Sequence, residues 1–207
     1  MPRPDPSPLT TDAFQRAAAV SRETLDRLTV YLSLLEKWQP RINLVGAATL
    51  RDPWRRHFLD SAQLVSLLPE STQTVVDLGS GAGFPGLVLA ILGVPDVHLI
   101  ESDQRKIAFL REVAAATGTK ITVHPTRIEA VPPFFADAVT ARALAPLAPL
   151  IEYALPFLGP KGVCLFLKGG QVEREILESQ RVMTVERFES RSDPSGVVLR
   201  LSAISST

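Results

Sequence analysis

The segment Asp77-Leu78-Gly79-Ser80-Gly81-Ala82-Gly83-Phe84-Pro85-Gly86 decides the fold of this chain. It follows a β-branched run at residues 74–78 and precedes an apolar stretch at about 85–92 that is typical of a short helix. Glycine suits such a turn because the chain reverses tightly and a ligand can approach a backbone that carries no Cβ. The segment therefore predicts a strand, a ligand-binding loop and a helix in immediate succession.

Beyond this loop, short β-branched runs alternate with helical stretches, which predicts an α/β fold with a parallel sheet and helices on both faces. The expected parallel strands are 74–78, 97–101, 120–124, 137–141 and 162–168, and the expected helices are at about 85–92, 103–117, 146–158 and 171–180. The last candidate strands, 182–189 and 196–203, are separated by a short turn region with no room for a helix. We therefore expect them to pair as a C-terminal antiparallel hairpin.

The sequence before the loop predicts helices. Leu25, Leu28 and Leu35 recur at helical spacing between Ser21, a candidate N-cap, and Pro40. A second helix is expected to begin at Asp52-Pro53. We expect a disordered, proline-rich tail at 1–8, a helical extension at 9–71 and the sheet domain at 72–207.

Composition limits the possible functions. The 207 residues include 22 Lys plus Arg and 22 Asp plus Glu, so the chain lacks the basic excess common in nucleic-acid-binding proteins. Its single cysteine, Cys164, excludes an internal disulfide and a cysteine-based zinc cluster. No apolar run approaches the roughly 20 residues that a membrane helix needs. We expect a cytoplasmic protein with no metal and no membrane partner.

The glycine loop leaves two cofactor classes open. Gly81-x-Gly83-x-x-Gly86 matches the dinucleotide fingerprint, which keeps an NAD-dependent oxidoreductase as an alternative. We favour S-adenosylmethionine, because an acid at Asp77 would repel a diphosphate but suit a cation. The additional Gly79 and the terminal hairpin also depart from a dinucleotide fold. Glu101, at the end of the second strand, suits the ribose hydroxyls of either cofactor.

Several short motifs together resemble the RsmG (GidB) family. They are Asn43-Leu44, Arg56-His57-x-x-Asp60-Ser61, the segment 77–86, Arg127-Ile128-Glu129, Ala141-Arg142-Ala143 and Lys168-Gly169. The resemblance extends from about residue 21 to 170. It implies a class I S-adenosylmethionine-dependent methyltransferase with an N-terminal helical extension, which modifies N7 of a guanine in 16S ribosomal RNA or the small-subunit particle.

The resemblance also implies site residues. Gly79 and Phe84 would line the cofactor pocket, Ile128 and Glu129 would flank the adenine, and Arg142 would stand at the methyl-transfer mouth. The full set of expected cofactor contacts is Asp77, Gly79, Gly81, Gly83, Phe84, Glu101, Ser102, Ile128, Glu129 and Arg142. The family usually carries a basic residue at the start of the last strand. This chain has Pro194-Ser195-Gly196-Val197 there, so no RNA contact is transferred to that segment.

The expected reaction needs no general base, because guanine N7 has an exposed lone pair and no proton to lose. Alignment of the reactants is then the main contribution of the enzyme, worth about 7–11 kcal/mol in favourable cases. Arg142 is the expected catalytic residue, at the carboxyl end of the fourth strand. It suits an RNA phosphate, the cofactor carboxylate or guanine O6, or alternatively a structural pair with an acid.

Basic side chains near this edge are candidates for RNA binding. The residues that we expect to contact RNA are Arg55, Arg56, His57, Arg127 and Lys168. For each, a solvent-facing role is the simpler alternative, as is a buried structural role for His98, His124, Cys164, Trp38 and Trp54. A methyltransferase for a small molecule or a protein, and an RNA-binding protein without activity, remain alternatives of the same fold.

Overall fold

The computed structural model describes residues 7–179 and 181–205, and its centre is a seven-stranded sheet in the order β3-β2-β1-β4-β5-β7-β6. The strands are β1 (Thr74–Leu78), β2 (Asp96–Ile100), β3 (Thr122–His124), β4 (Ala136–Arg142), β5 (Leu158–Lys168), β6 (Thr184–Glu189) and β7 (Val197–Ser202). Strands β1 to β5 pair in parallel, and β7 pairs antiparallel with both β5 and β6. The predicted five parallel strands and terminal hairpin are confirmed.

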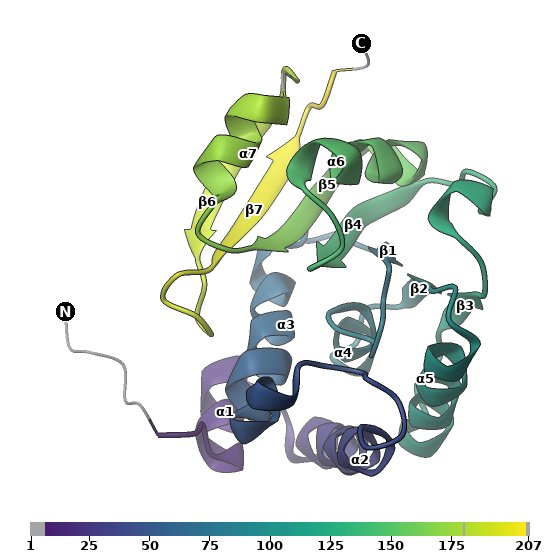
Figure 1. Ribbon diagram of the computed structural model, residues 1–207, viewed down its shortest axis with the longest axis vertical. Helices are drawn as coiled ribbons and strands as arrows, with labels where there is room; N and C mark the ends of the chain where they lie inside the picture. The colour runs from purple at the N-terminus through teal and green to yellow at the C-terminus, as the bar shows by residue number, and fades with distance from the viewer. Residues whose placement is uncertain (1–6, 180, 206–207) are drawn as a thin grey trace.

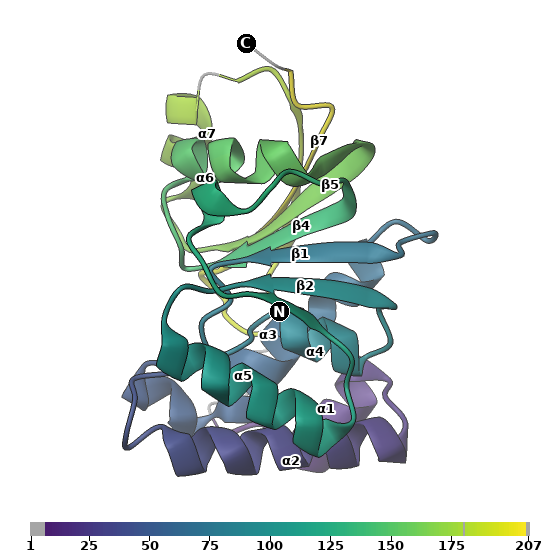
Figure 2. The ribbon, with the colours of Figure 1, turned by 90° about the vertical axis from the view of Figure 1, so that its right-hand side faces the viewer.

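Helices cover both faces of the sheet (Figure 2). The helices α4 (Gly86–Ile91) and α5 (Gln104–Thr117) cover one face, and α6 (Leu147–Ala154) and α7 (Val172–Ser179) cover the other. Successive strand side chains point to opposite faces, so Val75 joins one buried apolar cluster and Val76 the other. Cys164 is fully buried in the second cluster, as expected of a core residue.

The N-terminal extension packs on the same face as α4 and α5 (Figure 1). It contains α1 (Thr11–Ala18), α2 (Arg22–Trp38), the short 3₁₀ turn η1 (Ala47–Arg51) and a helical segment formed by η2 (Trp54–Leu59), α3 (Asp60–Ala62) and η3 (Gln63–Leu67). Ser21 caps α2 as predicted, because its hydroxyl accepts a hydrogen bond from Thr24 N at 3.1 Å. Residues 1–6 of the predicted tail lie outside the described residues.

The second predicted helix begins after Pro53, but Asp52 does not cap it. The carboxylate accepts hydrogen bonds from Leu9 N at 2.8 Å and from Arg55 Nε at 2.6 Å. The first turns, η2, are wound as a π-helix. Such windings are rare and are often found at functional sites.

Aromatic side chains anchor the extension to the glycine loop. The rings of Tyr31 and Phe84 are stacked with centroids 5.1 Å apart, and the Tyr31 hydroxyl donates a hydrogen bond to Ala82 O. Trp54 packs against Phe58, and the Trp38 indole donates to Glu112 Oε2 at 3.0 Å. Both tryptophans are therefore packing anchors, as predicted. Within the described residues, no helix has the length and apolar character to cross a membrane.

Candidate active site

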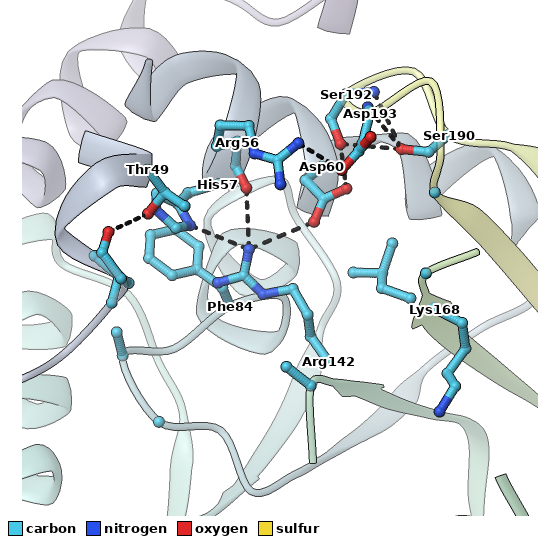
Figure 3. A pocket seen from close by; sticks show the side chains of 18 of the residues that line it. Thr49, Arg56, His57, Asp60, Phe84, Arg142, Lys168, Ser190, Ser192 and Asp193 are labelled. Carbon is cyan, nitrogen blue, oxygen red and sulfur yellow. Dashed lines mark hydrogen bonds and ion pairs between the residues drawn. The ribbon is translucent and has the colours of Figure 1, made fainter. Parts of the chain in front are cut away.

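A cavity of about 580 Å³ lies at the carboxyl ends of β1, β4 and β5, where open α/β sheets usually bind ligands. Its wall is formed by the glycine loop, the segment 44–60, the ends of β4 and β5 and the loop between β6 and β7 (Figure 3). Among the predicted site residues, those that line it are Gly79, Gly81, Phe84, Arg56, His57, Arg142 and Lys168. The sheet thus assembles residues that are far apart in the sequence.

The glycine loop presents its backbone to the cavity. Gly79, Gly81 and Gly83 have φ values of 61°, 57° and 90°, which glycine adopts without the steric cost that a Cβ brings. Gly79 and Gly81 belong to the cavity wall. Gly83 does not, because a Cβ there would lie 2.7 Å from the Tyr31 hydroxyl, inside the core.

Asp77 lies beneath this loop and is fully buried. Its Oδ2 accepts a hydrogen bond from Gly86 N at 3.2 Å, and its Oδ1 accepts one from Thr140 Oγ1 at 2.8 Å. Burial raises the pKa of this carboxyl to about 6. The acid expected at the mouth of the loop thus faces the start of α4 and is not part of the cavity wall.

Glu101 connects the glycine loop to the start of α5. Its Oε2 accepts from Gly81 N at 2.9 Å, and its Oε1 accepts from Ser102 N at 2.7 Å and Asp103 N at 2.8 Å. The carboxylate is nearly buried and lies directly behind a residue of the cavity wall. Glu101 therefore fixes the loop, with Ser102 beside it.

The segment after β3 lies apart from the described cavity. Ile128 and Glu129 belong to the short turn η4 (Ile128–Ala130), where Glu129 is exposed and Ile128 packs on the second apolar cluster. Arg127, just before this turn, is also exposed. These predicted contacts stay predictions.

Arg142 extends from the end of β4 toward the helical segment η2–α3 (Figure 3). Its Nη1 lies 3.1 Å from Arg56 O, 3.1 Å from His57 Nδ1 and 3.4 Å from Asp60 Oδ2. The guanidinium carbon lies 5.0 Å from the centroid of the Phe84 ring, a cation–π geometry. One turn of the extension and one residue of the glycine loop therefore hold the strand-end arginine.

His57 is buried behind this arginine, with 3% of its surface exposed. Its ring is stacked on Phe84 at 4.9 Å, and its Nε2 lies 2.7 Å from Thr49 Oγ1. Burial, with the charges of Arg142 and Arg56, lowers the pKa of His57 to about 3. The imidazole is therefore neutral near pH 7, and its burial does not suit the predicted contact with an RNA phosphate.

The other predicted RNA-binding side chains differ in availability. Arg55 forms an ion pair with Asp52 at 2.6 Å, and Lys168 forms one with Glu175 at 2.6 Å. Arg56 pairs with Asp193 at 2.7 Å, but its side chain stays 39% exposed on the cavity rim. Internal carboxylates therefore already neutralise these cations.

Lys106 is a cavity residue that the sequence reading missed. It lies in the first turn of α5 and, among the described residues, has no acidic partner within ion-pair distance. The sequence could have indicated Lys106, because it lies in the first turn of the predicted helix that follows Glu101. Lys106 is thus a cation that is free to meet an anion.

The loop between β6 and β7, residues 190–196, closes one side of the cavity. Asp193 contacts Arg56, and the Ser192 hydroxyl donates to Asp60 Oδ1 at 2.5 Å. Arg191 N donates to Gln63 Oε1 at 2.8 Å. Just before the segment 194–197, which lacks the expected basic residue, the loop therefore presents the acid Asp193 to the cavity rim, and the loop is tied to the extension.

Comparisons with known proteins place this geometry in context. Residues 24–198 match the family described as GidB: rRNA small subunit methyltransferase G. A protein of Rhodospirillum rubrum named Ribosomal RNA small subunit methyltransferase G is 62% identical over 200 residues, which cover 95% of this chain and 98% of that protein. A protein of the same name from Rhodospirillum centenum is 61% identical, covering 97% and 94%.

Solved structures share this fold at low sequence identity. A putative O-methyltransferase from Klebsiella pneumoniae superposes with a TM-score of 0.62 at 15% identity, covering 93% of this chain and 95% of that one. TYW2 of P. horikoshii, solved in complex with MeSAdo, gives 0.61 at 18% identity, covering 81% and 66%. At these identities the likeness shows the fold, which is that of class I methyltransferases.

Proposed function

This chain belongs to the GidB family of rRNA small subunit methyltransferases, and from that premise we propose that it transfers the methyl group of S-adenosylmethionine to N7 of a guanine in 16S ribosomal RNA. The observation that carries the proposal is a single cavity with the glycine loop on one wall and Arg142 on another. The loop that we propose holds the cofactor and the arginine that we propose meets the substrate thus line the same cavity.

The glycine loop fits the cofactor. Its backbone at Gly79 and Gly81 lines the cavity, and a Cβ on Gly79 would come within 2.6 Å of Leu144 Cδ1. Bound S-adenosylmethionine supplies a methyl group on a positively charged sulfur. We propose that Gly79, Gly81 and Phe84 hold it.

The remaining predicted contacts suit the adenosine part. Glu101 and Ser102 follow β2, and Ile128 and Glu129 follow β3. Because β1, β2 and β3 are adjacent parallel strands, their carboxyl ends share one edge of the sheet with the glycine loop. We propose that the adenosine lies along this edge.

The polar side chains of the cavity favour an acceptor that has no proton to lose. His57 has a pKa of about 3, and its ring already contacts Arg142 and Thr49. Among the described cavity residues, the carboxylates of Asp60, Asp193 and Glu175 each lie within ion-pair distance of an arginine or lysine. Guanine N7 needs no general base, so catalysis by alignment is sufficient.

The cations of the rim suit the RNA backbone. We propose that Arg56, Lys168 and Lys106 contact phosphates at the cavity, with Arg55 and Arg127 farther out. Binding at Arg56 or Lys168 requires a phosphate to compete with Asp193 or Glu175. We also propose that Arg142 orients the guanine or the cofactor at the point of transfer.

Mass spectrometry of nucleosides from 16S RNA tests the proposal directly. Cells that lack this protein should lose one N7-methylguanosine, and the wild-type gene should restore it while Arg142→Ala should not. Unchanged methylation would contradict the RNA substrate. Calorimetry adds a second test, because S-adenosylhomocysteine should bind and NADH should not; the reverse result would favour an oxidoreductase.

A further inference from the structure

A series of hydrogen bonds runs from Arg142 along the cavity wall through His57 and Thr49 to Gly46. Arg142 Nη1 lies 3.1 Å from His57 Nδ1, and His57 Nε2 lies 2.7 Å from Thr49 Oγ1. The Thr49 hydroxyl donates to Gly46 O at 2.6 Å. Figure 3 shows His57 beside Phe84, between Arg142 and Thr49.

The chemistry of the groups fixes the direction of every bond. A guanidinium only donates hydrogen bonds, so His57 Nδ1 must accept. A neutral imidazole with Nδ1 as acceptor carries its proton on Nε2, which therefore donates to Thr49 Oγ1. The Thr49 proton is directed to Gly46 O, so Thr49 Oγ1 is left to accept from His57 Nε2–H. Arg142 Nη1 has two protons for the three acceptors Arg56 O, His57 Nδ1 and Asp60 Oδ2, so Thr49 is the partner that fixes the proton on Nε2.

The far end of this series belongs to the cavity itself. Gly46 and Thr49 line the cavity, as do Leu44 and Val45. Gln39 holds this loop on the end of α2, because its Nε2 donates to Val45 O at 2.7 Å and its Oε1 accepts from Leu44 N and Val45 N. These hydrogen bonds thus connect Arg142 to the part of the cavity wall that Gln39 holds in place.

We propose that His57 is a positioning residue for Arg142, held in its Nε2–H tautomer by Thr49. The inference replaces the RNA contact that the sequence predicted for His57, and its kinetic consequence rests on the proposed function. Because His57 is stacked on Phe84 and Phe84 also lies under the Arg142 guanidinium, the imidazole controls both the direction and the distance of the arginine.

Two variants at Thr49 test whether its hydroxyl fixes the tautomer of His57. Thr49→Val keeps the shape but removes the acceptor for His57 Nε2–H, whereas Thr49→Ser keeps the hydroxyl and is the matched control. His57→Phe keeps a ring on Phe84 and removes both hydrogen bonds. Because a misplacement of about 1 Å can cost about 10²-fold in rate, we expect kcat to fall by about that factor in His57→Phe and by less in Thr49→Val.

Nitrogen NMR of the imidazole gives a readout that is independent of activity. The chain has 3 histidines, so the His57 signals can be assigned by their loss in His57→Phe. We expect a proton on Nε2 and a bare Nδ1 in the wild type and in Thr49→Ser at pH 7. In Thr49→Val we expect a mixture of tautomers, and KM values for RNA and cofactor close to those of the wild type.

The outcomes separate this inference from the proposed function. A wild-type His57 protonated on Nδ1, or a His57→Phe enzyme with unchanged kcat, would overturn the positioning role. A rise in KM alone in His57→Phe, with kcat unchanged, would also overturn the positioning role, because it would indicate that His57 contacts the substrate. If the wild type methylates no RNA, the proposed function fails, while the NMR spectra still decide whether Thr49 sets the tautomer.

Discussion

Gly79 and Gly83 share a left-handed backbone but have different neighbours, so their substitution should affect different properties. A Cβ on Gly79 would lie 2.6 Å from Cδ1 of Leu144, the flexible end of a side chain that packs against the second apolar cluster. A Cβ on Gly83 would lie 2.7 Å from Tyr31 Oη and 2.9 Å from Leu87 Cβ, in the core. Gly79 belongs to the cavity wall, whereas Gly83 lies where the extension packs on the sheet layer.

Gly79→Val should therefore abolish binding of S-adenosylhomocysteine with a moderate loss of stability. The backbone strain at this φ is about 1–2 kcal/mol for a residue with a Cβ. Gly118→Val is the matched control, because Gly118 has the same φ of +61° and nothing within 4 Å of its Cβ position. Calorimetry and urea unfolding of both variants check the prediction; retained binding in Gly79→Val would disprove the placement of the cofactor.

The buried carboxyl of Asp77 should make stability depend on pH. Its pKa is about 6 in the folded protein and 3.8 as a free group, so between these values the folded state holds a proton that the unfolded state has lost. The contribution is therefore favourable at low pH and is lost as pH rises through 6. Relative to the wild type, Asp77→Asn should gain about 2 kcal/mol of unfolding free energy between pH 4.5 and 7.5.

Urea unfolding of the wild type and Asp77→Asn at both pH values measures this difference. The comparison cancels the titration of every other group, because both proteins share them. An asparagine can accept from Gly86 N while Thr140 rotates its hydroxyl to accept from the new amide. If the free energy of unfolding changed equally with pH in the two proteins, Asp77 would not be responsible for the pH dependence.

Some site residues can be read from the sequence and others cannot. The glycine loop and the strand-end Arg142 follow from local pattern, because a strand, a glycine turn and a helix place them at the carboxyl edge. The partners of Arg142 cannot be predicted from local pattern, because Asp60 lies 82 residues away along the chain. Only tertiary packing decides that His57 is buried against Phe84 while Arg56, its neighbour, stays on the rim.

At the scale of elements, strands such as β1, β4 and β5 and long helices such as α2 and α5 could be predicted because each has several buried positions. The helix α1 was missed because its 8 residues bury only Phe14, too little for a periodic pattern. The π winding of η2 was also not predictable. A shift in backbone hydrogen bonding leaves no mark in composition, although it sets which side chains of 54–59 face the cavity.

The loop between β6 and β7 should compete with RNA for Arg56. Asp193 pairs with Arg56, and this contact lowers the pKa of the acid to about 2, so the pair persists at neutral pH. Asp193→Asn should free one cation. RNA affinity should then rise, and the slope of log affinity against log salt should steepen by about 0.7–0.9, the equivalent of one phosphate.

A filter-binding titration over a range of salt concentrations checks this expectation. Glu178→Gln is the matched control, because it removes the same charge from an exposed pair with Arg174 on α7. In an Arg56→Met background, Asp193→Asn should have no effect on affinity. Weaker RNA binding by Asp193→Asn would instead show that the closed loop is part of the binding surface.

At the scale of the whole molecule, the extension and the sheet share one core. Phe14, Tyr31 and Phe58 of the extension lie in the same buried cluster as Leu87 and Val97 of the sheet layer. Arg27 of α2 also donates to Thr117 O and Thr119 Oγ1, both at 2.9 Å. The sequence pattern changes near residue 72, but the hydrophobic core is continuous across this boundary.

We therefore predict that extension and sheet unfold in one transition, and the chain carries a natural probe for each. Its 2 tryptophans, Trp38 and Trp54, are both in the extension. Its only cysteine, Cys164, is fully buried in β5, and burial raises the pKa of its thiol to about 12. The thiol should react with a labelling reagent only when the sheet opens, because the thiolate is the reactive form.

Tryptophan fluorescence and Cys164 labelling should give the same urea midpoint, as two-state unfolding requires. Arg27→Met should lower both midpoints together, because it removes hydrogen bonds between the two parts while leaving each probe untouched. If fluorescence changed at lower urea than labelling, the extension would be a separate unit. In that case the contacts of Arg142 with His57 and Asp60 of the extension would be lost before the sheet unfolds. Methyl transfer should then be lost at the first of the two transitions.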